Sequence, residues 1–203
     1  QLTQDDHRAR VEFLLWTNQR TAASKLKYLL TSDYRKLVDA RIALAARSRN
    51  VDALVDAVPA NLQDNPGLLY ERAKWRRQKL RNQDVATPLL TGIDGNDIPE
   101  AGRSRLWDER NIAIRTDLKD GNWSRAYQLA SPHGMESGGD FAEAEWVSGW
   151  IALRLKNDAD RSLQHFETMS DGVSTPISLA RGKYWAGRAR DALGQPDAAR
   201  TDY

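Results

Sequence analysis

The chain has 203 residues, of which 40% are hydrophobic and 29% charged, a composition typical of a folded protein rather than a disordered one. Its formal net charge is only +2, which does not by itself predict a nucleic-acid or anionic-membrane partner. It contains no cysteine, so thiol catalysis, disulfides and cysteine metal sites are excluded, and the redox compartment stays open.

Helical signals predominate along the chain, and no alternating strand pattern is found. Asn65-Pro66 and, much later, Thr175-Pro176 each place a capping side chain before a proline in the first helical turn. Two apolar stripes have helical spacing: Val38, Ile42 and Ala45, and then Trp146, Trp150 and Leu153. We therefore predict an all-α fold.

Helix breakers recur at a nearly constant spacing. They are Asn18, Asn50, Asn82, Gly121, Asn157 and Gly194, with gaps of 32, 32, 39, 36 and 37 residues, the scale of a helix-turn-helix repeat. Gly187, Ala199 and Tyr203 have the spacing of the small, small and aromatic positions of a tetratricopeptide-like repeat. We predict one domain over residues 1–203, a curved α-solenoid of about six stacked helical hairpins with irregular loops near 92–102 and 131–140.

The strongest cluster of charge lies in the helix expected after Asn65. Its cationic side chains are Arg72, Lys74, Arg76, Arg77, Lys79 and Arg81. Two interpretations stay open: contact with an anionic polymer, either nucleic acid or cell-wall peptides, and a solvated helix face. Trp75 is the tryptophan best placed to stack on a sugar, whereas the other six are expected to pack between helices. The candidate polymer-contact residues are Arg72, Trp75, Arg76, Arg77 and Lys79.

No pattern predicts catalysis, a cofactor or a metal site. His7, His133 and His165 are isolated, with no second ligand at i+3 or i+4 that forms a known metal site. No phosphate-binding glycine motif and no Gly-x-Ser-x-Gly elbow occurs. Glu136-Ser137 lies in a glycine-rich stretch, where a loop or helix-start role is expected. No apolar run is long enough to predict a membrane span.

Three stretches carry a resemblance to a known family. They are residues 50–59 with 65–77, residues 107–130, and residues 133–155 continuing to 172–178 and 184–189. The third is the most specific, because helix periodicity does not dictate its mixture of tryptophan and small residues. In these stretches the chain resembles the helical superstructure of soluble lytic murein transglycosylases, enzymes that cut the peptidoglycan of the bacterial cell wall.

The resemblance implies a superhelix that precedes a lysozyme-like catalytic domain. Such enzymes act outside the cytoplasm of Gram-negative bacteria, and they cleave between N-acetylmuramic acid and N-acetylglucosamine without water. Glu136-Ser137 lacks the sequence that follows the family's catalytic Glu-Ser pair, so no catalytic residue is carried over. The chain is therefore expected to be an inactive periplasmic scaffold of such an enzyme, which positions or restricts glycan strands. Its implied partners are peptidoglycan and the lysozyme-like domain of the same protein.

Two other functions remain open. A free-standing helical-repeat adaptor would bind protein segments and would need no lysozyme-like domain. A nucleic-acid binder would work through the basic helix at 72–81, but we expect no nucleic-acid partner, because the whole chain is nearly neutral. The chain starts at Gln1 rather than Met, and we therefore expect a processed or excised piece.

Overall fold

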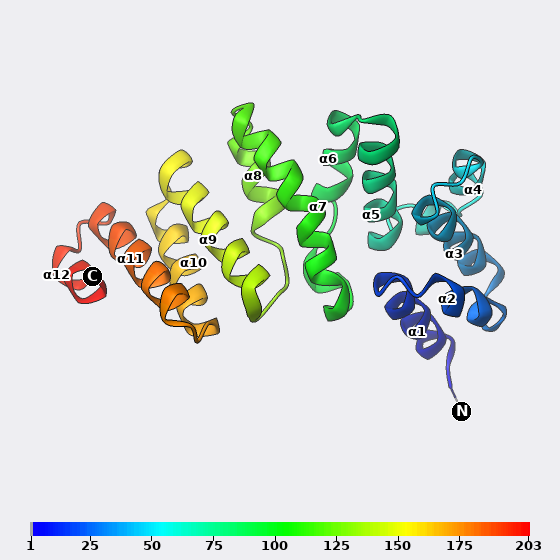
Figure 1. Ribbon diagram of the computed structural model, residues 1–203, viewed down its shortest axis with the longest axis horizontal. Coiled ribbons are helices and arrows are strands. Elements are labelled where there is room, and N and C mark those ends of the chain that lie inside the picture. Colours follow the sequence, from blue (N-terminus) through cyan, green and yellow to red (C-terminus); the bar gives the residue numbers. More distant parts are fainter. Residues whose placement is uncertain (1) are drawn as a thin grey trace. The chain divides into compact units, whose positions relative to one another are not determined.

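The computed structural model describes residues 2–203, and 78% of the chain is helical with no strand in the described range (Figure 1). The all-α prediction is confirmed. In chain order the α-helices are α1 (Gln4–Trp16), α2 (Arg20–Leu26), α3 (Ser32–Ala45), α4 (Val51–Asp56), α5 (Pro66–Trp75), α6 (Gln83–Thr91), α7 (Glu100–Lys119), α8 (Trp123–Ala130), α9 (Gly138–Leu155), α10 (Ala159–Gly172), α11 (Pro176–Ala192) and α12 (Pro196–Asp202). Short 3₁₀ turns form η1 (Lys27–Leu29), η2 (Ala60–Leu62) and η4 (Gly95–Asp97), and η3 (Arg76–Leu80) is a π-helix that continues α5.

The chain divides into two compact units. The first ends at Leu106, and the second comprises Trp107–Tyr203, so the boundary falls inside α7. In the second unit α9 packs on α10, α10 on α11 and α11 on α12. The single domain expected over residues 1–203 stays a prediction.

Each odd-numbered α-helix is followed by a residue with positive φ before the next helix begins. These residues are Asn18, Arg47, Arg81, Gly121, Asn157 and Gly194. A left-handed residue at this place reverses the chain and lets the next N–H groups reach the last carbonyls of the helix. After Asn18, for example, the N–H of Gln19 donates to the carbonyl of Leu14 at 2.7 Å, five residues back.

Two of the expected breakers lie slightly after the actual turn. Asn50 and Asn82 are the N-cap residues of α4 and α6, while Arg47 and Arg81 take the left-handed conformation. The Asn82 side chain accepts a hydrogen bond from the N–H of Val85. Asparagine favours both left-handed turns and N-caps, which explains the small displacement.

The two expected loops are shorter than predicted, because glycines at their ends belong to helices. The first ends before α7, and Gly102 lies inside that helix. A Cβ atom there would lie 2.7 Å from the ring of Trp16, so this glycine permits close packing and does not mark a loop. The second ends before α9, which already includes Gly138 and Gly139.

A buried ion pair lies at the centre of the first unit. Arg41 of α3 is 1% exposed, and its Nη1 donates to Oε2 of Glu12 in α1 at 2.5 Å. The hydroxyl of Tyr34 donates to the other carboxylate oxygen at 2.6 Å. The guanidinium also lies over the Trp16 ring, 5.6 Å from its centroid. Burial and the charge of Glu12 both raise the pKa of Tyr34, so this hydroxyl stays a donor.

Tryptophan packing dominates the second unit. Trp146, Trp150 and Trp185 pack around the buried ring of Phe166. The predicted packing role fails for Trp123, which is 45% exposed at the first position of α8, where its side chain faces outward.

Two alanine substitutions in α9 test this packing. A Cβ at Gly149 would lie 2.8 Å from Phe166 Cε1, and that ring is fully enclosed. Gly149→Ala is therefore expected to lower the free energy of unfolding by about 1–3 kcal/mol in urea denaturation. Gly139→Ala is the control, because no atom lies within 4 Å of its Cβ position; it should be neutral or stabilising by about 0.4–1 kcal/mol. Equal destabilisation by both variants would contradict the packing.

Candidate binding pocket

The polymer-contact residues expected from the sequence lie along α5 and η3. Arg72, Arg76 and Arg77 are half-buried, and Lys79 is exposed. Burial lowers the pKa of Arg72, and the neighbouring charge of Arg76 acts in the same direction. These cations therefore form one partly solvated stretch of positive charge.

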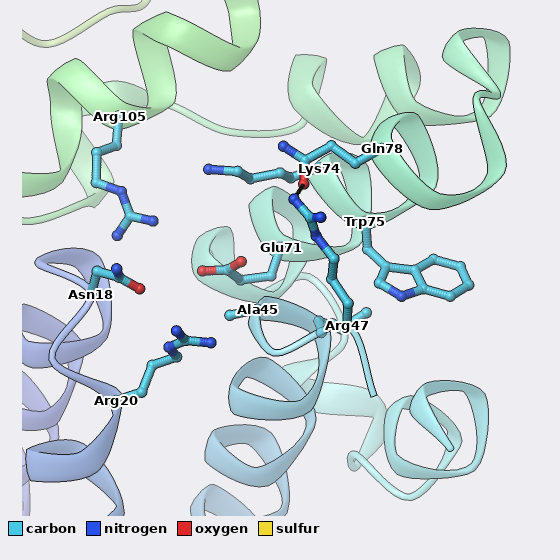
Figure 2. A pocket seen from close by; sticks show the side chains of 10 residues that line it. Asn18, Arg20, Ala45, Arg47, Glu71, Lys74, Trp75, Gln78 and Arg105 are labelled. Carbon is cyan, nitrogen blue, oxygen red and sulfur yellow. Dashed lines mark hydrogen bonds between the residues drawn. The ribbon is translucent and has the colours of Figure 1, made fainter. Parts of the chain in front are cut away.

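Trp75 has different surroundings from these four cations. It is half-buried and packs against the apolar core of the first unit. Its Nε1 is buried and makes no hydrogen bond among the described residues. Figure 2 shows the ring directed away from Glu71. Of the five candidate residues, Trp75 alone lines a cavity beside α5.

A cavity of about 190 Å³ lies beside α5 in the first unit (Figure 2). Four of its lining residues, Glu71, Lys74, Trp75 and Gln78, follow the helical spacing i, i+3, i+4 and i+7, which places them on one helix face. The rest of the lining comes from the turn after α1 (Asn18), the start of α2 (Arg20), the end of α3 (Leu44 and Ala45), the turn that follows α3 (Arg47) and α7 (Arg105).

Glu71 is the most buried charged group of this lining. It is 5% exposed, and it makes no hydrogen bond or ion pair with any residue of the described range. In Figure 2 its carboxylate points to the side on which Asn18, Arg20 and Arg105 lie. Burial raises the pKa of Glu71, and nearby cations, Arg41 first among them, oppose that rise without cancelling it.

Three of the four cations around Glu71 are held in place by neighbours. Arg47 donates from Nη2 to Oε1 of Gln78 at 2.6 Å. Lys74 donates to the Tyr70 hydroxyl at 3.0 Å. Arg105 donates from Nη1 to the backbone carbonyl of Trp16 at 2.6 Å, and its guanidinium lies 5.7 Å from the centroid of the Tyr70 ring.

The fourth cation, Arg20, has no such partner. It makes no hydrogen bond or ion pair within residues 2–203. With Arg47, Lys74 and Arg105 it gives the cavity four positive side chains against the single carboxyl of Glu71. The cavity is therefore suited to a small ligand that carries negative charge.

The sequence predicts the charge of this helix but not the cavity. One signal was visible in the sequence. Glu71, Lys74 and Gln78 have the helical spacing i, i+3 and i+7, so a single glutamate in an otherwise basic helix shares a face with polar neighbours and with the tryptophan. Its burial depends on α3 and α7, which approach α5 only in the folded chain, so the signal alone could not have marked a pocket.

A second polar cluster, in the second unit, corrects the view of His133 and His165 as isolated. His133 Nε2 lies 3.1 Å from Oε1 of Glu145, and His165 Nδ1 lies 2.5 Å from Oε2. The N–H of Met135 donates to His133 Nδ1, which leaves the proton of a neutral ring on Nε2, facing Glu145. The Tyr127 hydroxyl lies 2.8 Å from His165 Nε2. Glu145 thereby joins α8, α9, α10 and the loop before α9.

Glu145 is 7% exposed and accepts from both histidines. Burial tends to raise its pKa, but the hydrogen bonds from His133 and His165 outweigh that effect and leave the pKa below its ordinary value. Glu145 is thus a buried carboxylate whose charge is compensated, in contrast to Glu71.

Glu136 and Ser137 are both exposed, and Ser137 is the N-cap residue of α9, a helix-start position as expected. Within residues 2–203 no group of three or more histidine, aspartate or glutamate side chains is arranged to hold a metal ion. None of the helices in that range is long and apolar enough to cross a membrane. Comparisons with protein-family models, with curated proteins and with solved structures find no match to this chain.

Replacement of Glu71 should stabilise the protein at neutral pH. Because the pKa of Glu71 is raised in the folded state, ionising it costs stability once the pH exceeds the ordinary value of 4.5. Glu71→Gln removes that cost, so the free energy of unfolding should rise at pH 8, and the gain should vanish below about pH 4.5. Urea denaturation between pH 4 and 8 measures it, with exposed Glu136→Gln as control. Destabilisation at pH 8 would contradict the argument.

Glu145 should show the opposite pH dependence. Its lowered pKa contributes stability that is fully present above 4.5 and is lost as the pH falls through the folded-state value. Glu145→Gln replaces one acceptor oxygen by an amide donor that faces a histidine N–H, so a loss of about 1–3 kcal/mol is expected at pH 7.

The same urea series should show this loss shrinking towards acidic pH. Exposed Asp171→Asn is the matched control and should change stability little. A loss that stays constant down to acidic pH would mean that the carboxylate charge of Glu145 is not responsible.

Proposed function

We propose that this chain is a non-catalytic scaffold segment of a periplasmic peptidoglycan lytic transglycosylase of a Gram-negative bacterium. In this proposal its helices are stacked tetratricopeptide-like hairpins that form a curved solenoid. The segment positions or restricts glycan strands for a lysozyme-like catalytic domain of the same protein. The sequence resemblance supports the enzyme class, and the helical architecture is compatible with a scaffold.

The recurring left-handed turn is the observation that carries the repeat architecture. Its positions, 18, 47, 81, 121, 157 and 194, are 29, 34, 40, 36 and 37 residues apart. Helix-turn-helix repeats of tetratricopeptide type have a period of about 34 residues. In the second unit, successive helices from α9 to α12 pack on their neighbours, as stacked hairpins do.

Two features support a non-catalytic role. Glu136 is exposed at the end of a loop, without the burial that tunes a general acid. Glu145, which is buried, already accepts from two histidines and is occupied by a structural task. The reaction of the proposed enzyme would therefore belong to its lysozyme-like domain.

In this proposal the cationic stretch on α5 and η3 binds the cell wall. Arg72, Arg76, Arg77 and Lys79 lie there with partial or full exposure. Peptides of the cell wall carry carboxylates, to which arginine presents paired N–H donors. Such contacts are weakened by salt, because exposed charges are screened.

One observation favours the alternative of a free-standing adaptor that binds protein segments. Ile177, Tyr184 and Tyr203, on α11 and just after α12, expose large apolar surfaces. Exposed aromatic side chains are common at protein-binding surfaces. The adaptor would need no lysozyme-like domain and would not bind peptidoglycan.

Co-sedimentation with purified peptidoglycan sacculi tests the scaffold proposal. The chain should pellet with sacculi at low salt, less at moderate salt, and should release no anhydro-muropeptides. The double variant Arg76→Gln/Lys79→Gln should pellet less. Arg10→Gln/Lys183→Gln, which removes two exposed cations elsewhere, should pellet normally.

Anhydro-muropeptides from a clean preparation would contradict the non-catalytic role. Failure to pellet would favour the adaptor.

A further inference from the structure

We infer that the cavity beside α5 binds an amino acid with an acidic side chain, free or at the end of a peptide. Its ammonium group would pair with Glu71, and its carboxylates would bind the surrounding cations. This inference rests on the lining of the cavity and goes beyond the proposed scaffold function, which uses other residues.

The first argument is the isolation of Glu71. Carboxylates that are almost fully buried are normally paired, because an unpaired buried charge is costly. Glu145 in the second unit follows that rule with two hydrogen bonds. Glu71 is equally buried, has none within the described chain, and lines a cavity. A ligand ammonium in the cavity would be the missing partner.

The second argument is charge balance. Arg20, Arg47, Lys74 and Arg105 line the same cavity as one carboxylate, so the lining carries an excess of positive charge. An amino acid with a neutral side chain would leave that excess unchanged, whereas a free acidic amino acid reduces it by one charge. An acidic residue at the amino end of a peptide lacks the α-carboxylate but still places its side-chain carboxylate among the cations. The three arginines keep N–H groups beyond those already bonded, and guanidinium groups bind carboxylates with paired hydrogen bonds.

The third argument is size and access. The cavity measures about 190 Å³, below the range of about 300–1,000 Å³ typical of sites for drug-sized ligands. It suits a group of single-residue size. Asn18 and Arg47 are exposed while Glu71 is buried, so the cavity leads from the surface inward. A peptide whose terminal residue occupies the cavity can therefore continue into solvent.

The lining is also organised without a ligand. Gln78 holds Arg47, Tyr70 holds Lys74, and the backbone carbonyl of Trp16 holds Arg105. Side chains fixed in advance lose little conformational freedom on binding, which favours affinity for a small ligand.

Glu71 should make the cavity distinguish glutamate from glutarate, and this difference can be measured. Glutarate has the two carboxylates of glutamate but lacks the ammonium group, so beside Glu71 it meets a like charge instead of a partner. Titration calorimetry of the full chain should therefore detect binding of at least one enantiomer of glutamate. Glutarate and inorganic phosphate should bind at least about tenfold more weakly.

Variants separate the two halves of the site. Glu71→Gln should weaken the binding of glutamate about tenfold or more and leave the binding of glutarate unchanged or tighter. The preference for glutamate over glutarate should therefore disappear. Arg20→Gln should weaken both ligands, since it removes a cation. Arg10→Gln, an exposed cation outside the lining, should bind like the original chain. Circular dichroism and thermal unfolding confirm that each variant is folded.

A comparison with a dipeptide shows whether the ligand is a free amino acid or the end of a peptide. If the dipeptide glutamyl-alanine binds as well as glutamate, the site takes the end of a peptide; if glutamate alone binds, it takes the free amino acid. Either result supports the inference. Three results would overturn the inference. The first is binding of glutarate or phosphate as tight as that of glutamate, and the second is a preference for glutamate over glutarate that persists in Glu71→Gln. The third is no binding of either glutamate enantiomer or of the dipeptide.

Discussion

The first unit is organised around the buried guanidinium of Arg41. It joins α3 to Glu12 of α1, stacks over Trp16, and approaches Gly67 of α5 so closely that a Cβ there would lie 2.1 Å from its Cζ. Breaking a buried ion pair by removing one partner typically costs about 3–5 kcal/mol, so three helices depend on one interaction. The same charge acts on the pKa of Glu71 in α5, which lines the cavity, and opposes the effect of burial there.

The two buried glutamates show how surroundings decide the role of one residue type. Glu145 receives hydrogen bonds from two histidines and links three helices and a loop. Glu71 receives none and is opposed only by charges at a distance. A carboxyl that costs stability and faces a cationic cavity is the kind of group that functional sites retain. This contrast makes the pocket beside α5 the leading candidate site.

Several local features were predictable from the sequence because they depend on neighbouring residues alone. Asn65 and Thr175 cap α5 and α11 before a proline, as expected. Gly121 and Gly194 adopt the left-handed turns that separate helices. Gly102 was misjudged as part of a loop, because its role is to admit the ring of Trp16, a residue distant in the sequence. Local patterns thus located the helices, while close approaches between helices were invisible.

By itself the sequence determined the all-helical class, the caps, most turn positions and the basic character of the helix after Asn65, since these follow from backbone preferences and spacing within one segment. Only the tertiary structure decided which charges are buried. It placed Glu71 in a cavity lined by cations from α2, the turn after α3, α5 and α7, and it brought His133 and His165 to one carboxylate. The physical reason is that burial, ion pairs and side-chain hydrogen bonds form between segments far apart in the chain. The sequence of one segment does not show which other segments will pack against it.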